Sequence, residues 1–186
     1  MEEMGENVQD LRFIFTAVGR KIFRQLLPLT FQKKGGEYTV ATFVDEYERQ
    51  LDDRGRIILP AKVREAIGSN VYITRSPSEK CLHLYTEEEW GIISERLRSL
   101  PAAYDKNAAA FVRMFFGTAT SCEVDKQGRI SVGKRLCEFA GLKKDVVLVG
   151  VNTRLEIWSC EEWEAYNSQL SETLILEGIE KFGLII

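Results

Sequence analysis

A seven-residue pattern occurs twice in this chain of 186 residues, 73 positions apart. Leu51–Ile57 reads LDDRGRI and Val124–Ile130 reads VDKQGRI, and the same shift places Glu88-Glu89-Trp90 on Glu161-Glu162-Trp163. One offset that holds over such a stretch indicates a tandem duplication. Each copy is too small to bury a sheet alone, so we expect the two copies to pair into one compact, pseudo-symmetric barrel.

Each copy predicts the same order of elements. The motif D-x-x-G-R combines two turn-forming residue types, so a tight turn should join two strands there. The turn-forming residues are Asp52, Gly55, Asp125 and Gly128. Pro60 and Gly68 bracket a short helix over residues 61–67, and Gly133 and Gly141 bracket its counterpart in the second copy.

Two further strands follow the short helix in each copy. Their β-branched and aromatic side chains, with alternation in the second strand of each pair, predict strands packed on one side. These strands cover residues 71–74, 82–85, 146–149 and 155–158. His83 is expected to face outward in this alternation. Trp90 and Trp163 hold matching helix positions and are expected to pack in the core rather than stack on bases.

Longer helices are expected after these strands. Residues 87–100 and 107–116 each carry apolar side chains on one stripe at helical spacing. In the second copy we expect a single helix from about Glu161, followed by an apolar tail over residues 182–186. Such a tail can be disordered, or it can cover a neighbouring copy in an oligomer.

The residues that usually carry catalysis are scarce. The chain has one His and no nucleophile, zinc-protease or phosphate-loop motif, so we expect no enzyme, no catalytic residue, no metal and no cofactor. The four cysteines lack metal or redox spacing, which is typical of free thiols in a reducing cytosol. With 25 Lys+Arg against 28 Asp+Glu, the net charge of −3 excludes a uniformly basic nucleic-acid coat but allows a basic patch.

Residues 1–41 are interpreted as an N-terminal extension. Basic residues interrupt its apolar stretch over 11–29, which excludes a spanning helix or a signal peptide. A frayed extension is favoured over an amphipathic helix on a membrane. A further hypothesis is that Lys34–Glu37 is encoded by a purine run like a bacterial ribosome-binding site, with a GUG start at Val40. Residues 1–39 would then be leader from a start assigned too far upstream, which the intact mass of the native protein tests.

The order of motifs from about residue 42 to the C-terminus resembles the bacterial MraZ family. The matching segments are LDDRGRIILPAKVR at 51–64, CLHLY at 81–85, EVDKQGRI at 123–130 and EIW at 156–158. One turn motif alone would indicate only the wider AbrB/SpoVT-like group. The resemblance implies an α+β fold in which tandem AbrB/SpoVT-like repeats form one pseudo-symmetric swapped-hairpin β-barrel with flanking helices.

The resemblance also implies a domain organisation. The parts are a first AbrB/SpoVT-like repeat over 42–88, a helical connector over 89–117, a second repeat over 118–161 and a C-terminal helix and tail over 162–186. The second copy departs from the first because Gly133 replaces Pro60 and Cys137 replaces Arg64. The N-terminus of its short helix is therefore expected to be less strongly defined, and the helix is expected to be less basic.

Basic side chains gather around both turns. Residues 49–64 have a local net charge of +3 and residues 123–135 one of +2, whereas acidic clusters fall on the helices. Lys and Arg can neutralise phosphates there, and Arg can read guanine through a bidentate contact. The candidate DNA-binding residues are Arg56, Arg129, Arg54, Lys126, Lys62, Arg64, Arg49 and Arg135. Alternatively, the arginine of each motif pairs with the aspartate of its own turn.

Two functional hypotheses follow. The resemblance implies a transcriptional regulator of its own promoter and of the division and cell-wall gene cluster, which binds short direct repeats and assembles into rings. Its partners would be double-stranded DNA and further copies of the chain, with no membrane, in the cytoplasm and associated with the nucleoid. The alternative is an oligomeric, antitoxin-like protein-interaction module whose basic turns bind acidic proteins and whose DNA binding is incidental.

Overall fold

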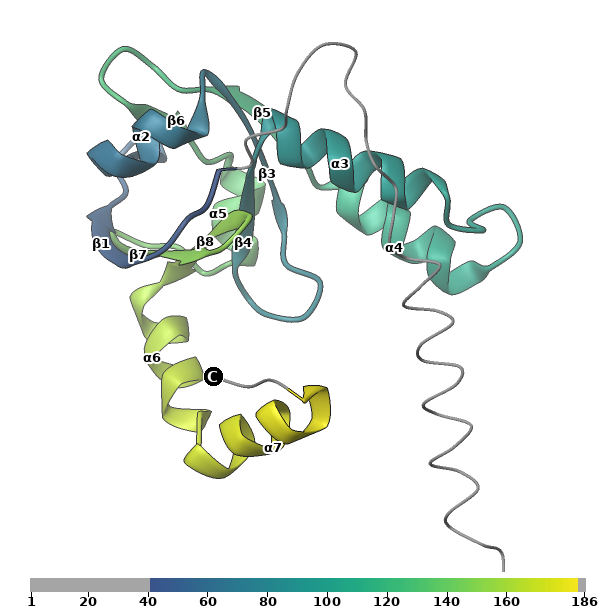
Figure 1. The fold of residues 1–186 in the computed structure, drawn as a ribbon. Coiled ribbons are helices and arrows are strands. Elements are labelled where there is room, and N and C mark those ends of the chain that lie inside the picture. The colour runs from purple at the N-terminus through teal and green to yellow at the C-terminus, as the bar shows by residue number, and fades with distance from the viewer. Residues whose placement is uncertain (1–40, 184–186) are drawn as a thin grey trace, which may run out of the picture. The chain divides into compact units, whose positions relative to one another are not determined.

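A computed structural model describes residues 41–183 (Figure 1). The leader hypothesis, the helix proposed for residues 11–29 and the end of the apolar tail lie outside the described residues. The strands are β1 (Glu46–Gln50), β2 (Arg56–Ile58), β3 (Asn70–Arg75), β4 (Leu82–Thr86), β5 (Thr120–Glu123), β6 (Arg129–Ser131), β7 (Asp145–Val151) and β8 (Arg154–Ser159). The helices are α2 (Ala61–Ile67), α3 (Glu87–Arg98), α4 (Lys106–Gly117), α5 (Lys134–Phe139), α6 (Cys160–Gln169) and α7 (Glu172–Phe182).

The two copies share one antiparallel sheet. Its strand order is β1-β7-β8-β4-β3-β5, and β4 joins the copies by pairing with β8, where His83 lies opposite Glu156. The predicted strands and the helix over residues 61–67 are confirmed, and the fold is α+β. At one edge β1 of the first copy pairs with β7 of the second, and at the other edge β5 of the second copy pairs with β3 of the first. Neither copy can therefore form this sheet alone.

A separate two-stranded ribbon crosses between the copies. Strand β2 pairs with β6 in the register Arg56↔Ser131, Ile57↔Ile130 and Ile58↔Arg129. Backbone hydrogen bonds between the copies extend beyond the two strands, because the N–H of Leu59 donates to the carbonyl of Gly128 at 2.9 Å. Among the described residues the ribbon and the six-stranded sheet form two distinct sheets, so they do not constitute a closed barrel.

The core lies between the sheet and the ribbon. Ile57 and Ile130 are fully buried, and helices α2 and α5 contribute Val63, Ile67 and Leu136 to the same cluster. Apolar side chains at every second strand position meet apolar helix faces here, which is the arrangement that the sequence pattern favours. The cluster draws on both copies, so the duplication produces one core rather than two.

Helices α3 and α4 lie side by side over strands β3 and β4 (Figure 1). Trp90 stacks on Tyr72 at 4.7 Å and on Phe115 at 5.1 Å between ring centroids. In the second copy, Trp163 packs against Trp158 and Tyr166. Both tryptophans pack against aromatic neighbours, but each is half-buried rather than part of the buried core that the sequence predicts.

Strand β4 departs from the prediction of one-sided packing. All five of its residues are buried, because the core covers one face and aromatic side chains of α3 and α4 cover the other. The prediction that His83 faces outward is therefore wrong. Its Nδ1 lies 3.0 Å from the hydroxyl of Tyr85, and its Nε2 lies 3.4 Å from the carboxylate of Glu156.

The C-terminal region holds two helices rather than the single helix predicted from Glu161. Helix α6 ends at Gln169, and Leu170 takes an extended conformation. Ser171 then caps α7, because its hydroxyl accepts a hydrogen bond from the N–H of Leu174 at 3.1 Å. Serine competes for backbone hydrogen bonds and so favours such a boundary. None of the helices in residues 41–183 is long and apolar enough to cross a membrane.

Candidate nucleic-acid interface

The first D-x-x-G-R turn is held together by its own aspartate. Oδ1 of Asp52 accepts hydrogen bonds from the backbone N–H groups of Arg54 and Arg56, both at 2.9 Å. Oδ2 of Asp52 accepts from Nε of Arg56 at 2.8 Å and lies 2.7 Å from its Nη2. Gly55 adopts a φ of +71°, and a Cβ there would lie 2.9 Å from the carbonyl oxygen of Val132. Only glycine suits this position, because backbone of the second copy passes so close.

The second turn repeats this geometry. Oδ1 of Asp125 accepts from the N–H groups of Gln127 and Arg129 at 2.9 Å, and its Oδ2 accepts from Nε of Arg129 at 2.7 Å. The guanidinium of Arg129 also donates to the side chain of Gln127 at 2.6 Å. The ion pair that the sequence offered as an alternative to DNA contact is therefore present in both copies.

The ribbon places the two arginines on one face. Ile57 and Ile130 face the core, so their neighbours Arg56 and Arg129 face the opposite side. In this register the two arginines are diagonal neighbours, a relation that separates residues by about 7–8 Å. Each side chain is 26% exposed. A pair of arginines, one from each copy, is thus presented together at the surface.

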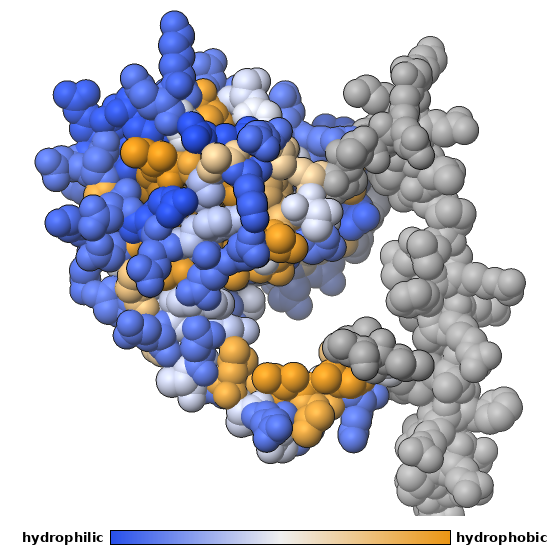
Figure 2. Space-filling view, turned by 60° about the vertical axis from the view of Figure 1, so that its left-hand side comes forward, coloured by the Kyte–Doolittle hydropathy of each residue, from blue (hydrophilic) through white to orange (hydrophobic). Residues whose placement is uncertain are grey.

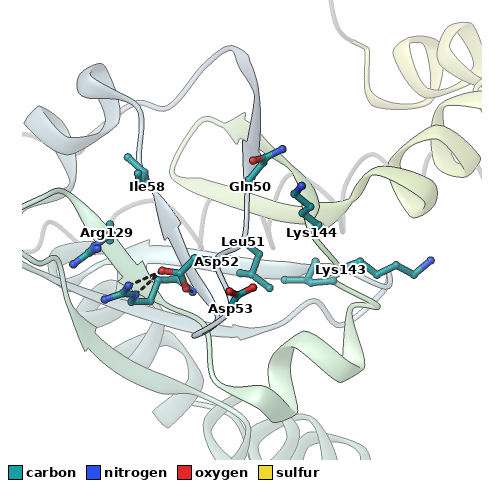
Figure 3. Close-up of a pocket in the computed structure, with 10 residues that line it drawn as sticks. Gln50, Leu51, Asp52, Asp53, Ile58, Arg129, Lys143 and Lys144 are labelled. Atoms are coloured by element: carbon teal, nitrogen blue, oxygen red, sulfur yellow. Dashed lines mark hydrogen bonds and ion pairs between the residues drawn. The ribbon is translucent and has the colours of Figure 1, made fainter.

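A cleft of about 590 Å³ opens beside this pair (Figure 3). Its basic lining comes from Arg56 and Arg129 and from Lys143 and Lys144, which stand on the other side of the cleft in this view. Sequence reasoning missed both lysines. The signal that could have found them is a basic pair in the loop after the second short helix, which has no counterpart in the first copy. Lys143 pairs with Glu161 at 2.7 Å.

The other predicted basic residues divide into two groups. Arg54 and Lys126 are exposed on the turns, and the side chain of Arg64 lies against Gly128 of the second turn. These three therefore lie with the arginine pair. The remaining three point to other neighbours: Lys62 pairs with Asp45 at 3.4 Å, Arg49 lies over the ring of Tyr47, and Arg135 lines a different cavity.

The charges at the turns are stabilised by these contacts. The hydrogen bond from the Arg56 side chain is the largest cause that lowers the pKa of Asp52, to about 2. The backbone N–H of Arg129 is the main cause that lowers the pKa of Asp125. The pKa of Arg56 is raised, mainly by its hydrogen bond with Asp52 and further by the charge of Asp125. Both aspartates are therefore ionised at neutral pH.

The chemistry available at this face is binding. Beside the carboxylates of Asp52 and Asp53, its groups are guanidinium and ammonium donors, which suit phosphates and guanine edges. Within residues 41–183, no group of three or more His, Cys, Asp or Glu side chains is arranged to hold a metal ion.

Comparison with known proteins agrees with the tandem architecture. The family model described as "MraZ protein, putative antitoxin-like" matches residues 42–113 and 115–177. A protein of Desulforamulus reducens named "Transcriptional regulator MraZ" is 47% identical over 127 residues, 68% of this chain and 88% of the relative. Proteins with the same name from Ligilactobacillus salivarius and Caldicellulosiruptor bescii are 45% and 43% identical, each over 76% of this chain and 99% of the relative.

Proposed function

Because the chain belongs to the MraZ family, we propose that it is a transcriptional regulator that binds double-stranded DNA through the face formed by its two turns, without a catalytic step. The observation that carries this proposal is the pair of arginines that the ribbon presents on one face, Arg56 from the first copy and Arg129 from the second. Arg54, Lys126 and Arg64 lie beside them and would contact phosphates.

The ion pairs within the turns leave the arginines able to bind. A guanidinium carries five N–H donors in a rigid fork, and the aspartate engages only the Nε and Nη2 side of Arg56. The opposite edge of Arg56 stays available for a base or a phosphate, whereas the Nη2 of Arg129 also donates to Gln127 at 2.6 Å. Since the aspartate also fixes the direction of the fork, less side-chain entropy is lost on binding.

The targets are part of the same proposal. We infer that the protein acts in the cytoplasm at the nucleoid, on short direct repeats in its own promoter, and thereby on the division and cell-wall gene cluster. One ribbon offers few base contacts, so useful affinity needs several copies of the chain on repeated half-sites. A ring of protomers would supply that arrangement.

An exchange of hairpins between the two copies, the swapped-hairpin part of the expected barrel, belongs to this proposal as well. The reciprocal bonds of Leu59 with Gly128 and of Val132 with Gly55 support an exchange of hairpins between the copies. We place the first repeat at 42–88, the connector at 89–117, the second repeat at 118–161 and the C-terminal part at 162–186. The two separate segments of the family match support a tandem division.

An anisotropy titration against the DNA directly upstream of the gene tests the function. We expect saturable binding that survives unrelated competitor DNA and weakens steeply as salt rises, because bound cations displace condensed counterions. The titration is run at two salt concentrations with a shuffled sequence of equal length as the control. Equal, weak binding to both DNAs would contradict the regulator and favour the antitoxin-like interaction module.

Helix α7 supports the oligomer. Its large apolar side chains are exposed, by 55% at Leu174 and 54% at Leu176, and Figure 2 shows orange, hydrophobic atoms gathered over α7. We expect Leu174→Asp to reduce the assembly to smaller species in light scattering, because a charge on an apolar contact is costly to bury. Gln169→Asp adds the same charge at an exposed polar position and should leave the mass unchanged. An unaltered mass in Leu174→Asp would exclude α7 from the contact.

A further inference from the structure

We propose that a second cavity, formed by the end of β3, the start of β5 and the start of α5, binds a small phosphate-type oxyanion at a site separate from the DNA-binding face. The cavity measures about 230 Å³, and its lining includes Arg75, Lys134 and Arg135 but no carboxylate. It shares no lining residue with the cleft beside the arginine pair. The proposal therefore does not depend on the proposed DNA binding.

Arg75 is the recessed cation of this cavity. It belongs to β3, and its guanidinium stacks over the ring of Phe139 at 4.4 Å from the centroid. Its Nε is buried and has no hydrogen-bond partner among the described residues. Because this N–H is out of reach of solvent, Arg75 contributes its positive charge to the cavity rather than this donor.

The repeat shows why this cavity carries unneutralised charge. At the offset of 73, Arg135 corresponds to Lys62, and Thr118 corresponds to Asp45. In the first copy Lys62 forms an ion pair with Asp45 at 3.4 Å. In the second copy the carboxylate is replaced by the Thr118 hydroxyl, and Arg135 has no ion-pair partner among the described residues. The positive charge at this position is therefore neutralised in the first copy and left unpaired by the described residues of the second.

The repeat also explains why the second copy has room for a ligand. The pairings of β3 with β5 and of β7 with β1 place Arg75 and Gly150 at equivalent positions. At the equivalent place, the backbone of Phe43 and Val44 in the first copy lies directly against Gly150 of the second copy and leaves no room for a side chain there. Where Arg75 takes this position, between β3 of the first copy and β5 and α5 of the second, the structure has an open cavity instead.

The chemistry of the lining selects the ligand class. Arginine forks match the tetrahedral oxygens of phosphate, and the small volume favours inorganic phosphate or the terminal phosphate of a metabolite. Lys134 adds a third cation, although its 3.8 Å pair with Glu138 occupies it in part. The hydroxyl of Thr118 donates to the carbonyl of Met114 at 2.7 Å, so its hydrogen is already engaged.

Calorimetric titration of the full chain with inorganic phosphate, at ionic strength held constant with sodium chloride, tests the site. We expect saturable binding that weakens at least about tenfold in Arg135→Ala, since a charge-assisted hydrogen bond is lost. Lys62→Ala, at the equivalent position of the first copy, is the matched control and should bind phosphate normally. Thr118→Asp recreates the carboxylate of the first copy and should abolish binding; circular dichroism verifies that the variants fold.

Three results would overturn the proposal. The first is no saturable binding of phosphate by the unmodified chain. The second is equal weakening in Lys62→Ala and Arg135→Ala, which would indicate a general charge effect. The third is displacement of phosphate by promoter DNA, which would assign these cations to the DNA backbone. Phosphate binding that persists in the presence of saturating DNA supports a separate site.

Discussion

Arg56→Ala is expected to weaken binding to the upstream DNA by about tenfold to a hundredfold, because a bidentate arginine contact contributes about 1–3 kcal/mol. Arg129→Ala should cause a similar loss, since its turn repeats the same geometry. Each substitution also leaves an aspartate without its partner, which places an uncompensated negative charge near the phosphates. The double variant should lose discrimination between promoter and shuffled DNA.

Two further variants separate the role of the fork from that of charge. Arg56→Lys keeps the charge but cannot form a bidentate contact, so it should retain most of the salt dependence while losing sequence preference. Arg98→Ala is the matched control, because Arg98 also pairs with a carboxylate, Glu95, on an exposed helix face outside the cleft. Normal promoter preference in the double variant would show that the ion pairs serve only the turns.

Glu156→Ala is expected to destabilise the fold more than the removal of any exposed carboxylate on the helices. The carboxylate is 13% exposed and accepts hydrogen bonds from Arg154 Nη2 at 2.8 Å and from Trp158 Nε1 at 3.1 Å. It also lies 3.4 Å from His83 at the point where β4 and β8 join the two copies. Its removal leaves these groups without an acceptor, which should lower the free energy of unfolding by about 2–3 kcal/mol.

The destabilisation should depend on pH. Burial acts to raise the pKa of Glu156, but hydrogen bonds from His83, Arg154 and Trp158 outweigh it and lower the pKa from 4.5 to about 2. A lowered pKa in the folded state stabilises the fold fully above the ordinary value of 4.5, and this contribution is lost as the pH falls toward 2. The difference between the unmodified chain and Glu156→Ala should therefore be larger at pH 7 than at about pH 3.5.

Urea denaturation at the two pH values measures this difference. Glu164→Ala, at an exposed position of α6, should change the free energy of unfolding by no more than about 0.5 kcal/mol at either pH. A loss in Glu156→Ala that is the same at neutral and at acidic pH would show that packing, rather than the carboxylate charge, is what the variant removes.

Local chemistry made much of this architecture readable from the sequence. Proline and glycine at the ends of residues 61–67 define a helix through their own backbone preferences, and the D-x-x-G-R motif closes its turn through contacts within five residues. The sequence pattern predicts one continuous helix past Gln169. It does not reveal that Leu170 takes an extended conformation and that Ser171 caps a second helix. His83 was misplaced because period-2 alternation cannot reveal that a helix pair covers the second face of β4.

The sequence by itself determined the duplication, the two charged turns and the strands and helices of each copy, because these depend on residues close together in the chain. Only the tertiary structure decided which strand pairs with which. The β2–β6 pairing puts one arginine from each copy on the same face. The fold also brings Lys143 and Lys144 to the same cleft, where they complete its basic lining. It also decided that Lys62 forms an ion pair whereas Arg135 forms none within residues 41–183, because an ion pair needs partners brought together from distant segments.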